Sequence, residues 1–350
     1  MRERGEAGTP PSSERGPAAR PERPGAENPR EFVEGLLGGD RRALARAITL
    51  VESTRPDHRA EAEELLSAVL PRTGGAMRVG VSGSPGAGKS TFIEALGVHL
   101  TDHGHRVAVL AVDPSSSVTG GSILGDKTRM EELTRREAAF IRPSPSRGSL
   151  GGVARRTREV LLLCEAAGFD VVLVETVGVG QSEVAVAAMV DLFLLLVAPG
   201  GGDELQGIKR GIVELADLVV VNKADGALAG AARVAAAEYA AALHLMRPRT
   251  PAWDPRVLSV SSIEGTGIAD LWTTVEEFRT TLDAAGVLGV RRAAQLRDWM
   301  WSEVIEGLTE TIRADAGTRD LLPGLEADVR DGRVAPTVAA HRLLDAFLRR

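Results

Sequence analysis

The chain has 350 residues, of which 43% are hydrophobic and 26% are charged, with a formal net charge of −6 and a single cysteine, Cys164. This composition is typical of a soluble globular protein, and the acidic balance disfavours nucleic-acid binding, which usually needs a basic surface. One cysteine excludes a disulfide framework within the chain. The apolar run at 192–198 is far shorter than the ~20 residues of a membrane span. We therefore expect a cytoplasmic protein without a membrane partner.

The first part of the chain changes character near residue 30. Residues 1–29 are rich in Pro, Gly, Arg and Glu, and we expect a disordered tail because such a segment buries too little apolar surface. Residues 30–72 show helical periodicity, with Leu44, Ile48 and Val51 on one face and Asp40 placed as an N-cap. This N-terminal helical segment shows no catalytic motif, so packing against the main domain is expected.

Residues 73–285 alternate between short β-rich apolar runs and helical stretches. This alternation predicts an α/β fold, a mostly parallel sheet covered by helices on both faces. Ligands of such sheets bind at the carboxyl ends of the strands, where the polar motifs of this chain fall. The apolar runs are 77–83, 106–113, 169–176, 191–198, 217–225 and 256–262.

A phosphate-binding motif follows the first of these runs. "GSPGAGKST" (83–91) matches G-x-x-x-x-G-K-[ST] between a predicted strand and a predicted helix, which indicates a P-loop NTPase. The backbone N–H groups would surround the β-phosphate, Lys89 would reach the β- and γ-phosphates, and Ser90 would bind Mg²⁺. The candidate phosphate-binding residues are Gly83, Ser84, Pro85, Gly86, Ala87, Gly88, Lys89, Ser90 and Thr91.

A second motif, "NKAD" (222–225), indicates a guanine site. Asp225 can accept hydrogen bonds from the N1–H and N2–H₂ groups that guanine has and adenine lacks. Asn222 can support the loop and contact the base edge, and the Lys223 stem can cover the ring beside Ala224. A site that pairs with such donors rejects ligands without them, so GTP is favoured over ATP. Backbone N–H groups of a later loop, at Ser261, Ser262 and Ile263, are candidates to contact guanine O6.

Three acidic residues at strand ends are candidates for the metal site and for catalysis together with Lys89. Glu175 ends a predicted buried strand and is assigned to the Mg²⁺ shell, since a buried carboxylate needs a cation or its water nearby. Asp113 and Asp126 flank a Ser- and Gly-rich loop, and either can touch the metal or orient water. An Asp-Pro turn is the alternative for Asp113, and a solvated acid is the alternative for Asp126.

The stretch "VETVGVGQSE" (174–183) has the pattern of a nucleotide-sensing switch without its usual side chain. Val179 stands where many GTPases have a water-orienting Gln, and Gln181 or Asp126 is left as a substitute. We expect slow GTP hydrolysis by the isolated protein and stimulation by a partner that orders the loops at 113–126, 175–183 and 199–212.

Residues 286–350 are helical again. The first helical stretch carries Leu296, Trp299, Met300, Val304, Ile305 and Leu308, a stripe that either packs on the nucleotide domain or pairs with a second subunit. Trp299, Met300 and Trp301 together suit an interface.

The motifs together resemble the MeaB/ArgK family, relatives of the human methylmalonic aciduria type A protein. Seven blocks carry the resemblance in order, across residues 30–350: "GDRRALARAITLVES", "GVSGSPGAGKST", "VDPSSSVTGGSILGDKTRM", "PSPSRGSLGGVARRTRE", "ETVGVGQSE", "GGGDELQGIKRGI" and "NKAD". Ser262 departs from the Ala that is usual in this family, and the N-terminal tail has no counterpart.

This resemblance implies a homodimeric GTPase that guards an adenosylcobalamin-dependent acyl-CoA mutase of the methylmalonyl-CoA mutase type. The family gates cofactor loading and removal of damaged cofactor, and residues 286–350 are implied to form the dimerisation arm. Cobalamin is expected on the mutase and not on this chain.

The sequence also bears on three other functions. A metallochaperone GTPase for another metalloenzyme would carry a Cys-x-x-Cys or His-rich insert, which this chain lacks. A nucleotide-dependent kinase linked to basic amino-acid transport would prefer ATP, against which "NKAD" argues. The intact phosphate loop argues against a non-catalytic scaffold.

Overall fold

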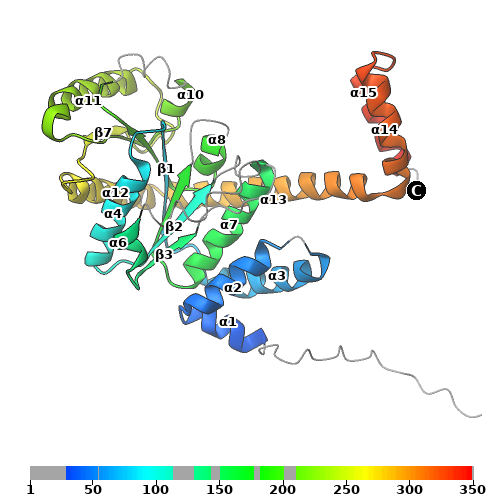
Figure 1. Cartoon of the computed structure of the whole chain (residues 1–350), viewed down its shortest axis with the longest axis horizontal. Coiled ribbons are helices and arrows are strands. Elements are labelled where there is room, and N and C mark those ends of the chain that lie inside the picture. The colour runs from blue at the N-terminus through cyan, green and yellow to red at the C-terminus, as the bar shows by residue number, and fades with distance from the viewer. Residues whose placement is uncertain are drawn as a thin grey trace, which may run out of the picture.

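A seven-stranded sheet forms the centre of the protein (Figure 1). The computed structural model describes residues 29–53, 55–112, 130–142, 150–176, 182–200 and 210–348. The strand order is β3-β2-β4-β1-β5-β6-β7, and every pairing is parallel. The predicted α/β class is therefore confirmed. The strands are β1 (Met77–Gly83), β2 (Val107–Val112), β3 (Ala139–Arg142), β4 (Val171–Thr176), β5 (Leu192–Val197), β6 (Leu218–Val221) and β7 (Arg256–Ser259).

Six of these strands coincide with the predicted apolar runs, whereas β3 was not predicted. β3 has only four residues, and three of them are only partly buried because the strand lies at the edge of the sheet. Such a short run carries too little periodicity to stand out from a loop. By contrast, β1, β2, β4, β5 and β6 are buried along their whole length, as expected for central parallel strands.

Helices cover both faces of the sheet and enclose separate apolar cores. On one face lie α4 (Lys89–Asp102), α6 (Glu131–Thr134) and α12 (Ile268–Ala284). On the other lie α7 (Leu150–Ala166), α8 (Ser182–Ala187), α10 (Arg210–Val213) and α11 (Ala229–His244). Cys164 of α7 is fully buried, and burial raises the pKa of its thiol.

The N-terminal helices pack on the outer side of α7. They are α1 (Pro29–Leu37), α2 (Arg41–Val51) and α3 (Pro56–Val69), followed by a 3₁₀ turn at Leu70–Arg72. Asp40 caps α2 by accepting a hydrogen bond from Arg42 N at 2.7 Å, and Leu44, Ile48 and Val51 are buried as predicted. An ion pair between Glu52 and Arg142 joins the end of α2 to the end of β3.

The C-terminal helices form an arm, which we define as α13 (Val287–Ala314), α14 (Ala316–Arg330) and α15 (Pro336–Leu348). α13 runs along the body and continues beyond it, and α14 and α15 form a hairpin at its far end (Figure 1). The predicted apolar stripe of α13 divides between two sides of the helix. Trp299 lies against α7 within stacking range of Arg158, whereas Met300 and Ile305 are exposed.

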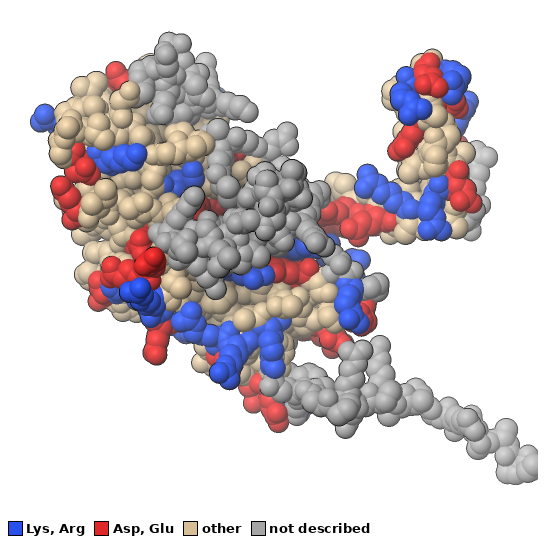
Figure 2. Space-filling view, viewed as in Figure 1, with Lys and Arg blue, Asp and Glu red and all other residues tan. Residues whose placement is uncertain are grey.

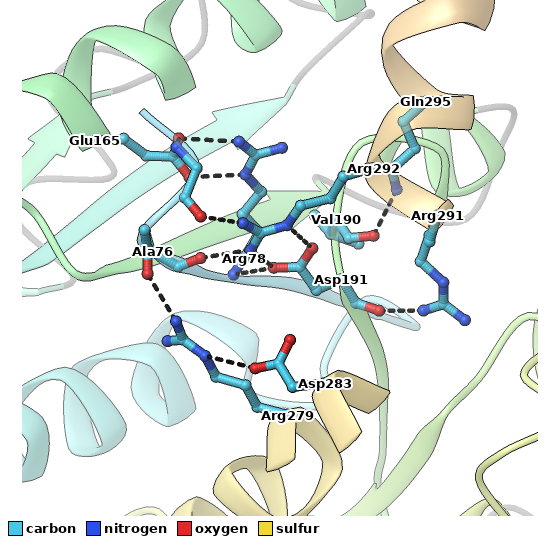
Figure 3. A network of polar contacts seen from close by, with 12 residues as sticks. Ala76, Arg78, Glu165, Val190, Asp191, Arg279, Asp283, Arg291, Arg292 and Gln295 are labelled. Carbon is cyan, nitrogen blue, oxygen red and sulfur yellow. Dashed lines mark hydrogen bonds and ion pairs between the residues drawn. The ribbon is translucent and has the colours of Figure 1, made fainter. Parts of the chain in front are cut away.

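A buried polar network anchors the root of the arm to the amino ends of the strands. Figure 3 shows the Arg292 side chain pointing toward Asp191 and the Arg78 side chain pointing toward Glu165. The fully buried carboxylate of Asp191 accepts hydrogen bonds from Arg78 N at 2.9 Å and from Arg292 Nε at 2.8 Å. The Arg78 side chain pairs with Glu165 of α7, with Nε at 2.8 Å from Oε1. Because a buried charge needs all its partners, this network fixes the direction in which α13 leaves the body.

Candidate functional site

The phosphate-binding motif lies where β1 passes into α4, at the carboxyl edge of the sheet. A Cβ built on Gly83 would lie 2.2 Å from Leu196 O of the neighbouring strand. Gly88 has a φ of 89°, and a Cβ there would lie 2.7 Å from Asn222 Nδ2. Both positions therefore require glycine. The loop closes directly before Lys89, so the N-terminus of α4 offers backbone N–H groups to an anion.

The Lys89 side chain folds along this loop. Its Nζ donates hydrogen bonds to Gly83 O at 2.8 Å and to Ser84 O at 3.3 Å. Burial lowers the pKa of the ammonium, while Glu175 and Glu183 act in the opposite direction. Ser84 Oγ is buried and has no hydrogen-bond partner among the described residues. A cation, a hydroxyl and a helix N-terminus in one loop suit the oxygens of a phosphate chain.

An oxygen pair beside the loop fits a magnesium ion. Ser90 Oγ, in the first turn of α4, lies 3.4 Å from Glu175 Oε1. β4 carries Glu175 opposite Val81 of β1, and Thr176 Oγ1 donates to Ser82 Oγ at 2.9 Å between the same two strands. This buried link holds the carboxylate level with the phosphate loop. Hydroxyl and carboxylate oxygens are ligands that Mg²⁺ takes together with phosphate and water.

Other predicted metal and water ligands lie outside the described residues. These are Asp113, Asp126 and Gln181, so their roles stay predictions. Val179 and residues 201–209 of the predicted loop at 199–212 also lie outside the described residues. Within the described part of the chain, no three His, Cys, Asp or Glu side chains are grouped so that they could hold a metal ion. This agrees with an ion that needs only one or two carboxylates because phosphate and water supply the other ligands.

The base motif lies directly after β6, beside the loop that follows β7. Ser261 Oγ donates to Asp225 Oδ2 at 2.5 Å and accepts from Glu264 N at 3.1 Å. Lys223 has a φ of 60°, an uncommon conformation for a residue with a side chain. Ala224 N donates to Val260 O at 3.0 Å. The carboxylate of Asp225 is thereby held at the end of the sheet as an acceptor for a base edge.

Asn222 connects the base motif with the phosphate loop. Its side chain is buried, and Nδ2 donates to Ala87 O at 2.9 Å. Its Oδ1 accepts from Ser262 Oγ at 2.6 Å and from Ser262 N at 3.3 Å. Of the two roles predicted for Asn222, support of the loop is therefore the one these contacts serve.

A cleft of about 530 Å³ opens beside the two loops. Thr91 of the phosphate motif lines it together with Ser262 and Ile263 of the base loop. Ile263 is strongly exposed at 81%. The rest of its lining comes from α4, α6, the same base loop and the start of α12, and Lys89, Ser90 and Asp225 do not line it. The base motif and the phosphate loop are joined instead by the hydrogen bond from Asn222 Nδ2 to Ala87 O.

The sequence motifs did not single out Glu183. It lies on α8 and is fully buried, and its charge, like that of Glu175, opposes the lowering of the Lys89 pKa by burial. Its position as the last residue of "VETVGVGQSE" was the available signal, since an acid directly after a switch segment lies close to the phosphate loop.

The phosphate loop is that of a P-loop NTPase, and Asp225 suits the donors of guanine and not those of adenine. Together they indicate a P-loop GTPase. Comparison with known proteins supports this class. The sequence profile of the family described as "Methylmalonyl Co-A mutase-associated GTPase MeaB" matches residues 44–317. The chain therefore belongs to the MeaB family.

Individual relatives agree with this assignment. "GTPase ArgK" of Escherichia coli is 54% identical over 79% of this chain and 83% of that protein. The "Methylmalonic aciduria type A homolog, mitochondrial" of Mus musculus is 52% identical over 89% of this chain and 78% of that protein. The solved structure of a "LAO/AO transport system kinase" is 41% identical, covers 92% of this chain and 98% of that one, and superimposes with a TM-score of 0.73.

Proposed function

We propose that this GTPase is a chaperone of an adenosylcobalamin-dependent acyl-CoA mutase of the methylmalonyl-CoA mutase type. It gates cofactor loading and protects or reactivates the mutase. The observation that carries the proposal is the match to a family described as mutase-associated over residues 44–317. The name of the mouse relative, which refers to methylmalonic aciduria, points to the same metabolism.

In this proposal, GTP binds with its phosphates on residues 83–91 and its base on Asp225. Lys89 binds the β- and γ-phosphates, and Ser90 and Glu175 hold Mg²⁺, which neutralises developing charge during phosphoryl transfer. The 3.4 Å contact between Ser90 Oγ and Glu175 Oε1 beside the phosphate loop supports the metal-binding role of these two residues. Asp113 and Asp126 complete the metal shell or orient water.

We also propose that a second copy of this chain covers the outer side of α13. Residues four apart lie on one helix face, and Gln295, Trp299 and Glu303 all contact the body or each other. The opposite side is apolar and exposed, and an apolar patch of this kind marks an interaction site. Its residues are Val290, Met300, Trp301, Val304, Ile305 and Leu308. On the face shown in Figure 2, charges of both signs are interspersed over the arm, so charge repulsion does not oppose self-association.

One contact gives the arm a route to the nucleotide. Arg155 of α7 pairs with Glu303 of α13 at 3.0 Å, and Glu303 Oε1 accepts from Trp299 Nε1 at 2.9 Å. α7 begins at Leu150, soon after β3 ends at the carboxyl edge of the sheet, and α8 follows the strand that carries Glu175. α7 therefore touches the arm, and in this proposal the nucleotide state reaches a partner through this contact.

Steady-state GTP turnover with and without purified methylmalonyl-CoA mutase tests the mutase role. We expect slow turnover alone and acceleration by about tenfold or more with the mutase, because completing a phosphoryl-transfer site in trans has effects of at least this size. An unrelated enzyme of similar size and the Lys89→Ala variant serve as controls. Fast turnover alone that the mutase leaves unchanged would contradict the proposal. Labelled γ-phosphate on a protein, in place of free phosphate, would indicate the kinase activity named for the solved relative.

The arm is tested separately by sedimentation. The wild-type chain should sediment as a dimer and Ile305→Glu as a monomer that still binds GDP. A monomeric wild-type chain would contradict the second-copy proposal and would leave the mutase role untested.

No helix in the described residues is long and apolar enough to cross a membrane.

A further inference from the structure

The hydroxyl of Ser262 is the first link in a buried chain from the base loop to the phosphate loop. Ser262 Oγ donates to Asn222 Oδ1 at 2.6 Å, and Asn222 Nδ2 donates to Ala87 O at 2.9 Å. Ser262, Asn222 and Ala87 are 8%, 1% and 1% exposed. Buried hydrogen bonds of this kind are stronger than exposed ones and polarise one another.

The first link determines what the second one can do. The amide of Asn222 presents an oxygen at one end and an NH₂ group at the other, so its orientation must match both neighbours. The hydroxyl donates at 2.6 Å, whereas the other donor to the same oxygen, Ser262 N, lies at 3.3 Å. The shorter contact therefore fixes the oxygen toward the base loop and turns Nδ2 toward the phosphate loop.

The second link ends where the nucleotide is held. Ala87 directly precedes Gly88, and an added Cβ on Gly88 would lie 2.7 Å from Asn222 Nδ2. The amide therefore packs directly under the turn whose N–H groups face the phosphates. On the other side, Ser262 adjoins Ser261, which holds Asp225 through a 2.5 Å hydrogen bond.

We propose that Ser262 is a positioning residue that slows nucleotide release by holding the base loop and the phosphate loop at one separation. A nucleotide contacts both loops, and loops that are already ordered lose less conformational entropy on binding. Differences of this kind between related complexes appear mainly in the dissociation rate. The inference rests on the GTPase activity of the chain and is independent of the mutase role.

The hydroxyl of Ser262 should act on release through Asn222 alone. It donates to Asn222, on the side of the phosphate loop that faces the base motif. Dependence on that amide is therefore the signature of this role, since a general loss of structure would speed release whether or not the amide is present.

The test is stopped-flow release of a fluorescent GDP analogue from preloaded full-length protein. Ser262→Ala should release it about threefold to tenfold faster, the effect of one buried hydrogen bond. Thr274→Val is the matched control, because Thr274 is also buried and its hydroxyl donates to Asp270 O within α12. Its release rate should match wild type.

A double-mutant cycle separates the link from general destabilisation. In an Asn222→Ala background the hydroxyl has no amide to orient, so Ser262→Ala should have no further effect on release. An unchanged release rate for Ser262→Ala would overturn the proposal. So would the same acceleration in the Asn222→Ala background.

Discussion

Replacing Asp225 with asparagine should exchange the base preference of the protein. The carboxylate offers two acceptor oxygens, of which Oδ2 already accepts from Ser261 Oγ at 2.5 Å. Asparagine replaces one oxygen with an NH₂ donor, so the base edge loses an acceptor and meets a donor facing guanine N–H. Xanthine has a carbonyl where guanine has its 2-amino group, and that carbonyl can accept from the new NH₂.

The size of the effect follows from how many hydrogen bonds the base edge gives up. A hydrogen bond to a charged group contributes about 1.5–3 kcal/mol, and leaving a buried donor unpaired costs a similar amount. Removing one such hydrogen bond predicts weakening of GTP binding by at least about 2 kcal/mol, or roughly 30-fold in Kd. Removing both would double the free-energy change.

Calorimetric titration with GDP, GTP and the xanthosine nucleotides measures this change directly. The variant should bind xanthosine triphosphate more tightly than the wild type does. Asp270→Asn, at an acid in the first turn of α12, is the control and should bind GTP like wild type. GTP affinity that stays unchanged in Asp225→Asn would falsify the guanine-site assignment.

Four further substitutions probe the phosphate site, the root of the arm and a buried acid. Lys89→Ala should abolish tight nucleotide binding in a titration, whereas Glu175→Ala should retain GDP and lose Mg²⁺-dependent hydrolysis; normal hydrolysis by Glu175→Ala would contradict the metal assignment. Asp191→Ala should lower the free energy of unfolding, measured by urea denaturation, by about 3–5 kcal/mol, because it leaves the buried charge of Arg292 unpaired. A decrease below about 1 kcal/mol, which is the range of surface ion pairs, would contradict this expectation. Burial raises the pKa of Glu159 from 4.5 to about 7, so the folded state binds its proton more tightly and stability falls as pH rises from 4.5 to 7. Glu159→Gln should remove up to about 3 kcal/mol of that fall, and an unchanged pH profile of unfolding would show that this carboxyl is not the cause.

The strands and the nucleotide motifs could be predicted because each depends on neighbours in the sequence. A buried parallel strand is a continuous apolar run, as β5 shows with "LFLLLV". The phosphate loop requires glycine at Gly88, where φ is positive, and a lysine and a serine next to it. Such constraints act over a few residues, so the spacing of the letters is enough to reveal them.

The same local reasoning missed β3 and left the packing side of α13 open. β3 is too short to show a period and is defined by its pairing with β2. On α13, Trp299 and Met300 are adjacent in one apolar pattern, yet Trp299 lies against the body and Met300 is exposed. A helical pattern specifies that two sides are apolar but does not say which side meets the rest of the chain.

By itself the sequence determined the α/β class, the P-loop, the guanine motif and the family to which they belong. Only the tertiary structure joined Ser262 through Asn222 to the phosphate loop, and Asp191 to Arg292 at the root of the arm. These contacts connect residues that are far apart in the chain. They exist because strand register and helix packing bring certain side chains within about 3 Å of each other, and no short-range pattern in a sequence encodes that distance.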